Sequence, residues 1–224
     1  MIVLDENRAK ITWTTPQTGA NGGWIDASAL TYKITRLPDS IVVAETTTGN
    51  EYIDNSITKL NIYSYQIQAI TPDGAGPTAT TDRLVMGPAL TVPYRCNFST
   101  DDQFALWNVI DANNDEYTWK RETTLAAAYY SYNEDGETGG DDWLVSSPIH
   151  LEKNKIYRLK FKLQSYDVGY PEKVAVHLGT GASVAEQTTL LGDYEIESNT
   201  FVEYKVILPE RLESGNYHIS FHCH

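Results

Sequence analysis

Apolar and polar residues alternate along most of the chain, as they do in β-strands that bury one face. Helical periodicity is nearly absent. Short clusters of glycine, proline, asparagine and aspartate separate the alternating runs, and such clusters favour turns. The clearest runs are 30–35, 63–70, 157–163, 174–178, 204–208 and 217–221. Many short strands at this spacing predict an all-β protein built from sandwiches.

Two prolines, Pro88 and Pro93, mark a boundary within the chain. Prolines this close together favour extended backbone, so we expect a short, stiff linker over 88–92. The charge changes there as well. Residues 1–90 carry 6 basic and 9 acidic side chains, a net charge of −3, whereas residues 91–224 carry 11 and 21, a net charge of −10. We therefore expect one domain over 1–87 and a second over 93–224.

The first domain carries a series of aromatic and aliphatic residues, Trp13, Tyr32, Leu60 and Tyr65, followed by the turn segment 73–77. In this order they resemble the fibronectin type III family, which implies an immunoglobulin-like β-sandwich. The resemblance also implies that Trp13 and Tyr32 fill the space between the sheets. Leu60 and Tyr65 would close a corner in which a tyrosine hydroxyl caps a backbone turn, although their spacing is one residue shorter than usual. We expect this domain to act as a spacer.

Three segments of the second domain, 107–115, 141–151 and 215–222, resemble in their order the cleaved-adhesin or choice-of-anchor family. Its members are MAM-like jelly-roll domains of secreted Bacteroidetes proteins. The resemblance implies a jelly-roll β-sandwich in a secreted or cell-surface protein. It also implies a last strand beyond residue 222, so we expect the domain to lack that strand. Within 141–151, we expect Trp143, Val145 and Ile149 to point inward, with Pro148 at an edge.

Acidic residues are concentrated between Asp101 and Asp142, where eleven carboxylates are offset only by Lys120 and Arg121. Oxygen ligands on turns, in sets of about 6–8, suit Ca²⁺. Members of the family bind structural calcium, but 97–99 reads Asn-Phe-Ser where those relatives have acidic residues. Calcium and a solvated acidic face therefore stay as alternatives. The candidate ligands are Asp111, Asn113, Asp115, Asp141 and Asp142.

Aromatic residues in or near the expected loops are candidates for contact with carbohydrate, because jelly-roll modules stack sugars on exposed rings. The alternative is that these rings pack against the sheet or a neighbouring domain. The candidates are Trp119, Tyr130, Tyr132, Tyr166 and Tyr170.

Histidine and cysteine residues offer two further candidate sites. His218, His222 and His224 share one strand parity and could hold zinc, or could simply lie at the surface. Cys96 opens the second domain and Cys223 closes it. Because the first and last strands of a sandwich often run side by side, a disulfide between them is one expectation, and two separate thiols are the other.

The net charge of −13 disfavours nucleic acid and anionic lipid as partners. No run of about 18 apolar residues is present, so we expect no membrane insertion. Motifs for nucleophilic, zinc-protease or nucleotide chemistry are absent from the sequence, which predicts a protein that is not an enzyme. We expect a non-catalytic extracellular binding or adhesion module, part of a larger secreted or surface protein, that binds a host or cell-surface protein or glycan. The alternative is an accessory carbohydrate-binding region of a secreted glycoside hydrolase or protease.

Overall fold

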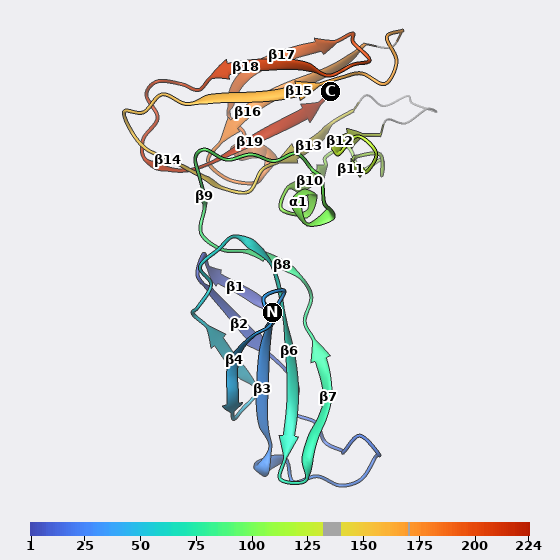
Figure 1. The fold of residues 1–224 in the computed structure, drawn as a ribbon, viewed down its shortest axis with the longest axis vertical. Helices are drawn as coiled ribbons and strands as arrows, with labels where there is room; N and C mark the ends of the chain where they lie inside the picture. The colour runs from blue at the N-terminus through green and yellow to red at the C-terminus, as the bar shows by residue number, and fades with distance from the viewer. Residues whose placement is uncertain (132–139, 170) are drawn as a thin grey trace. The chain divides into compact units, whose positions relative to one another are not determined.

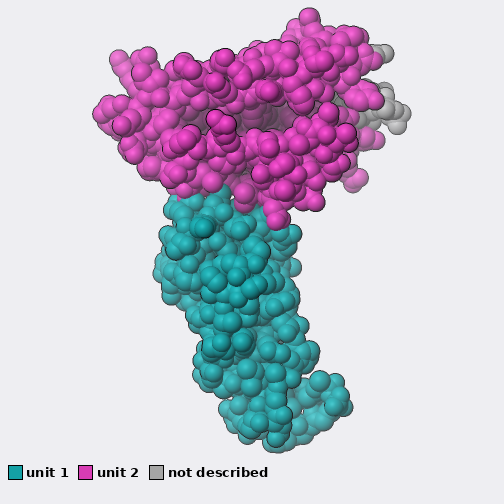
Figure 2. Space-filling view, in the orientation of Figure 1, with its two compact units in different colours: residues 1–88 teal, residues 89–224 magenta. Residues whose placement is uncertain are grey.

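The computed structural model describes residues 1–131, 140–169 and 171–224. The chain forms two compact units, unit 1 over Met1–Pro88 and unit 2 over Ala89–His224 (Figures 1 and 2). Strands dominate both units, which confirms the predicted all-β class. None of the helices in the described residues has the length and apolar character needed to cross a bilayer.

Unit 1 is an immunoglobulin-like β-sandwich. Its elements are β1 (Ile2–Asp5), β2 (Arg8–Thr12), the 3₁₀ helix η1 (Ala27–Ala29), β3 (Thr31–Leu37), β4 (Ile41–Thr47), β5 (Glu51–Asp54), β6 (Asn61–Thr71), β7 (Gly74–Thr80) and β8 (Leu84–Met86). One sheet has the order β1-β2-β5 and the other β4-β3-β6-β7, with β8 beside β6 (Figure 1). All of these strand pairs are antiparallel.

The core of unit 1 lies between its two sheets. Ile11, Ile34 and Tyr65 are fully buried there. Trp13 and Tyr32 pack together at this core, with ring centroids 5.0 Å apart. The expected packing of these two aromatic residues is therefore confirmed.

The tyrosine corner of unit 1 is formed by a different residue from the one we expected. The hydroxyl of Tyr63, not that of Tyr65, donates to a backbone carbonyl, that of Lys59, at 2.9 Å. The buried aliphatic residue that precedes it is Ile57, six positions earlier, rather than Leu60. The expected pair was wrong because Tyr63 and Tyr65 are two residues apart on the same buried face of β6, so alternation could not tell which of them caps the turn.

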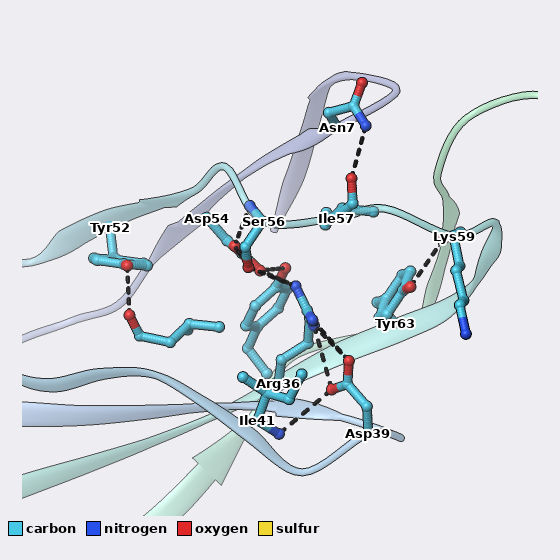
Figure 3. A network of polar contacts seen from close by, with 12 residues as sticks. Asn7, Arg36, Asp39, Ile41, Tyr52, Asp54, Ser56, Ile57, Lys59 and Tyr63 are labelled. Atoms are coloured by element: carbon cyan, nitrogen blue, oxygen red, sulfur yellow. Dashed lines mark hydrogen bonds and ion pairs between the residues drawn. The ribbon is translucent and has the colours of Figure 1, made fainter.

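Tyr65 instead bonds Asp54, which belongs to a buried polar network around Arg36. Figure 3 shows Arg36, Asp39, Asp54 and Ser56 of this network. The Tyr65 hydroxyl donates to Asp54 Oδ2 at 2.8 Å, and Arg36 Nη1 donates to the same oxygen at 2.9 Å. Asp39 accepts from the other side of the guanidinium at 2.7 Å, and Ser56 donates to Asp54 Oδ1. Every charged group in this network has a partner, as buried ion pairs require.

Unit 2 is a jelly-roll β-sandwich. Its elements are β9 (Leu90–Thr91), α1 (Asp101–Ala105), β10 (Asn108–Asp111), β11 (Trp119–Glu122), β12 (Ala127–Tyr130), β13 (Asp142–Val145), β14 (Ile149–Leu151), β15 (Arg158–Leu163), β16 (Glu172–Gly179), the 3₁₀ helix η2 (Val184–Glu186), β17 (Thr189–Ile196), β18 (Val202–Ile207) and β19 (Gly215–Cys223). Strand β9 lies within the segment that we expected to be a linker, and it pairs with β14.

The larger sheet of unit 2 is organised around β19. This strand pairs with β13, β14 and β16, while β10 extends the sheet beyond β13 and β17 extends it beyond β16. Two smaller antiparallel pairs, β11–β12 and β15–β18, complete the unit (Figure 1). Phe161 of β15 packs against Tyr194 and Phe221 of the larger sheet, so the core lies between these layers.

Strand β13 faces the core with the opposite parity from the one we expected. Leu144 belongs to the core cluster between the layers, whereas Trp143 stacks on His222 on the other face of the sheet. All four residues of β13 are buried, so the strand is covered on both faces. In such a strand, sequence alternation does not reveal which side chains point toward the core, because the residues on both faces are apolar.

Candidate metal centre

Asp142 begins β13 and is fully buried, with 0% of its surface exposed. Its neighbours in register are Asp111 on β10 and Cys223 on β19. Among the described residues, neither carboxyl oxygen of Asp142 accepts a hydrogen bond of standard geometry. A buried polar group in this condition costs free energy unless a further partner satisfies it.

The loop after β10 folds its acidic side chains back toward this point. Asp111 accepts from the backbone N–H groups of Asp115 and Glu116 at 3.2 and 2.9 Å. Asp115 accepts from the N–H of Tyr117 at 2.9 Å and from the amide of Asn113 at 3.2 Å. Of the five residues proposed from the sequence, the structure therefore brings Asp111 and Asp115 beside Asp142, and Asn113 bonds Asp115.

The pKa values of Asp142 and Tyr130 are both shifted upward in this crowded acidic site. Burial raises the pKa of Asp142, the neighbouring Thr118 hydroxyl lowers it, and the charges of Asp111 and Asp115 raise it further, with a net upward shift. Burial is also the main cause of the raised pKa of Tyr130, to which the charge of Asp142 adds. The site thus places negative charge where little solvent reaches it.

The chemistry of the donors fits a hard cation such as Ca²⁺, since all of them are oxygens. The two carboxyl oxygens of Asp142 and the adjacent Thr118 hydroxyl are buried without hydrogen bonds of standard geometry, and the carboxylates of Asp111 and Asp115 lie close enough to shift the Asp142 pKa. In the part of the chain that the structure describes, however, no three Asp, Glu, His or Cys side chains converge as a ready metal site. Asp111 and Asp115 would have to exchange backbone hydrogen bonds for the ion.

Asp141 does not belong to this group, which corrects the expectation from the sequence. Its Oδ1 accepts from Trp143 Nε1 at 3.1 Å and lies 2.8 Å from His222 Nε2. The reason is geometric, because successive residues of an extended chain point to opposite faces. Thr118 was not among the predicted residues. It precedes β11, and no feature of the sequence distinguishes it from other threonines.

The three histidines proposed for zinc have different polar partners, although the rings of His222 and His224 are neighbours with centroids 5.3 Å apart. His218 Nδ1 lies 2.6 Å from the carbonyl oxygen of Ser146, and His224 Nε2 lies 3.1 Å from Asp193 Oδ1. His222 stacks on Trp143 with centroids 3.9 Å apart and planes within 9°. Burial lowers the pKa of His222, and Asp141 opposes this shift.

The aromatic candidates for carbohydrate contact fall into three groups. Trp119 is only 8% exposed and packs on Tyr130 in the core, so these two rings do not form an open platform. The indole Nε1 of Trp119 donates to the Asp142 carbonyl oxygen at 3.2 Å, which accounts for its inward position. Tyr166 is 88% exposed. Tyr132 and Tyr170 lie outside the described residues.

The expected disulfide is not formed, since Cys96 and Cys223 are both free thiols. Strand β19, which carries Cys223, is an inner strand with β13 and β16 on either side at this position. The segment that carries Cys96 therefore does not run beside it. Tyr94 lies next to Cys96, and burial, followed by this thiol, raises the Tyr94 pKa.

No family model matches the chain, and no curated protein matches it. Among solved structures, it is similar to the K1 cleaved adhesin domain of Lys-gingipain from Porphyromonas gingivalis W83, with 22% identity over 53% of this chain and 80% of that chain and a TM-score of 0.43. It is also similar to a carbohydrate-binding module of the β-sandwich superfamily (11% identity, 98% of this chain, 92% of that chain, TM-score 0.30). A third similar structure is the FN1–FN3 fragment of chicken CNTN1, with 11% identity over 99% of this chain and 90% of that chain and a TM-score of 0.31. At these identities and TM-scores, the function has to be inferred from the chain's own residues.

Proposed function

We propose that this chain is a non-catalytic extracellular binding module, in which unit 2 contacts the partner and is stabilised by Ca²⁺, and unit 1 is a spacer. The observation that supports the proposal most is Asp142, a buried carboxylate whose two oxygens lack standard hydrogen bonds beside Asp111 and Asp115. The partner would be a host or cell-surface protein or a glycan.

The energetics favour a bound cation at this position. An ionised carboxylate buried without a partner costs several kcal/mol, and a divalent ion offsets that cost by supplying the missing charge. Asp142 and the Thr118 hydroxyl would hold the ion, joined by Asp111 and Asp115. We propose that the protein lies outside the cell or at its surface, where calcium-binding modules have dissociation constants of about 10⁻⁴–10⁻³ M.

Thermal unfolding of the full chain with excess Ca²⁺ and with EDTA tests this proposal. Calcium should raise the midpoint of unit 2 by about 5 °C or more, because an ion that binds only the folded state stabilises it. Asp142→Asn should abolish the response, whereas its neighbour Asp141→Asn should retain it, since Asp141 faces His222. Equal midpoints with calcium and with EDTA in the unmodified protein would remove calcium from the proposal.

A glycan is the second candidate partner, and the observation that supports it is the exposure of Tyr166 on the loop after β15. An open tyrosine ring can stack on a sugar face. Binding to a glycan array should then be lost in Tyr166→Ala and kept in the matched variant Val168→Ala, which truncates another exposed side chain of the same loop. Binding that survives Tyr166→Ala would exclude this ring as the platform.

A further inference from the structure

Strand β15 has a free edge. It pairs with β18, and no other strand pairs with it among the described residues. The backbone N–H of Leu208 donates to the carbonyl oxygen of Tyr157, directly opposite it, at 3.0 Å. Because backbone groups alternate in direction along an antiparallel strand, those of Arg158, Lys160 and Lys162 point away from β18. These three residues therefore present unpaired donors and acceptors at the open edge.

An apolar hollow of about 390 Å³ lies next to this edge. Its walls come from β15, from the segment after β18, from the inner face of the larger sheet and from the segment of Val92, Pro93 and Tyr94. Ile156 is 75% exposed, an unusual position for a large aliphatic side chain. The aliphatic lining includes Ile149, Leu151, Ile156, Leu159, Leu208 and Ile219.

The outward face of the β15–β18 pair is basic, although the chain as a whole carries a net charge of −13. Arg158, Lys160 and Lys162 are exposed on β15, and Lys205 lies directly opposite Lys160. Like charges placed opposite each other destabilise a strand pair. Glu203 bonds Lys205 at 2.9 Å and is the carboxylate on this face of the pair, so positive charge remains in excess.

We propose that the edge of β15 binds an extended peptide as an added strand, and that the peptide alternates apolar residues with acidic ones. The free backbone groups of β15 supply the main-chain hydrogen bonds of strand addition. Alternate side chains of an added strand point to opposite faces, so one set enters the hollow and the other faces the lysines.

The same features argue against other occupants. A glycan or a nucleic acid could contact the lysines, but neither has the regular backbone donors and acceptors that the β15 edge pairs with. A second copy pairing through its own β15 edge would bring two basic faces together, which is unfavourable. The inference extends the proposed function by naming a class of partner, and it does not depend on calcium.

The experiment measures binding of a synthetic peptide of about nine residues that alternates valine and glutamate, a length typical of one strand. The protein is the full chain, and the readouts are fluorescence anisotropy and amide hydrogen exchange. We expect the N–H groups of Lys160 and Lys162 to become protected. Peptides that alternate valine with lysine, or serine with glutamate, should bind at least about tenfold more weakly, because each loses one of the two side-chain contacts.

Two proline variants form a matched pair. Lys160→Pro removes a backbone N–H that points to the open edge of β15. Lys205 lies directly opposite Lys160, and Lys205→Pro removes a backbone N–H that points to the far edge of β18. Each variant also removes one positive charge from the same face. Lys160→Pro should abolish binding, whereas Lys205→Pro should stay within about twofold of the unmodified protein. Thermal unfolding confirms that both variants are folded.

Exchanging Lys160 and Lys162 for glutamate should reverse the preference, so that the valine–lysine peptide binds more tightly than the valine–glutamate one. Undiminished binding by Lys160→Pro, or equal loss in both proline variants, would overturn strand addition at this edge. If no peptide binds while calcium still raises the unfolding midpoint, the inference fails and the proposed function stands.

Discussion

Asp54 and Asp142 are both buried, with 1% and 0% of their surfaces exposed, yet their surroundings differ. Asp54 is held by Arg36, Tyr65 and Ser56, and although burial alone would raise its pKa, these hydrogen bonds bring the pKa below the usual value. Asp142 has no comparable set, and burial raises its pKa. One carboxylate is satisfied within the protein, while the other is suited to an external partner.

In EDTA, the stability of unit 2 should increase as the pH falls from about 7 toward the ordinary carboxyl value near 4. The folded-state pKa of Asp142 lies above its unfolded value, so the folded state binds the proton more tightly and its burial penalty is relieved on protonation. Urea unfolding of unit 2 across this range provides the measurement. Asp142→Asn should be more stable than the unmodified protein at pH 7, with the difference shrinking at low pH. A constant difference would contradict the assigned cause.

Replacing Asp54 has the opposite consequence for unit 1. Asp54→Ala leaves Arg36, itself only 4% exposed, without its buried partner. Breaking a buried pair in this way typically costs about 3–5 kcal/mol of unfolding free energy. Asp39→Ala removes a partner that is more exposed, and should cost about 1 kcal/mol or less. Comparable losses in the two variants, measured by urea unfolding, would show that burial does not set the cost.

At the scale of elements, the corner before β6 depends on the hydrogen bond from Tyr63 to the carbonyl of Lys59. Tyr63→Phe should therefore lower the unfolding free energy of unit 1 by about 0.5–1.5 kcal/mol, the usual contribution of a neutral hydrogen bond. Tyr65→Phe removes a bond to the charged Asp54 and should cost about 1.5–3 kcal/mol. Chemical denaturation of both variants tests the order, which would be reversed if Tyr65 formed the corner.

Alternation along the chain identified most strands, but it did not reveal which face of each strand is inward. On β6, Tyr63 and Tyr65 share one parity and are both buried, so alternation could not distinguish the corner tyrosine. On β13, Trp143, Leu144 and Val145 are apolar on both faces. Which face of such a strand points inward is set by its pairing with distant segments, and a single sequence does not contain that information.

The candidate site shows the same division between local and distant information. Asp111, Asn113 and Asp115 were proposed because they lie in an acidic, loop-like stretch, and that loop folds back on itself through short-range hydrogen bonds. Asp142 lies beside Asp111 because of the register of β13 against β10. Cys223 lies beside Asp142 because β19 is an inner strand of the sheet and pairs with β13. These pairings join segments far apart in the chain, so the set could be proposed from the sequence only in part.

At the scale of the whole molecule, unit 1 and unit 2 each have a core cluster of their own. The two buried aspartates lie in different units, Asp54 in the first and Asp142 in the second. Elements with separate cores unfold as separate cooperative units unless a large interface couples them. Perturbations of the two residues should therefore add without interaction.

Calorimetry of the full chain tests this independence. We expect two transitions, of which Ca²⁺ raises one and Asp54→Ala lowers the other, because the ion would bind unit 2 and the buried ion pair stabilises unit 1. In the Asp54→Ala protein, calcium should shift the unit 2 transition as far as it does in the unmodified protein. A calcium shift that depends on Asp54, or a single transition that both changes move together, would mean that the two cores fold as one. In that case unit 1 would be part of the calcium-linked structure rather than a spacer.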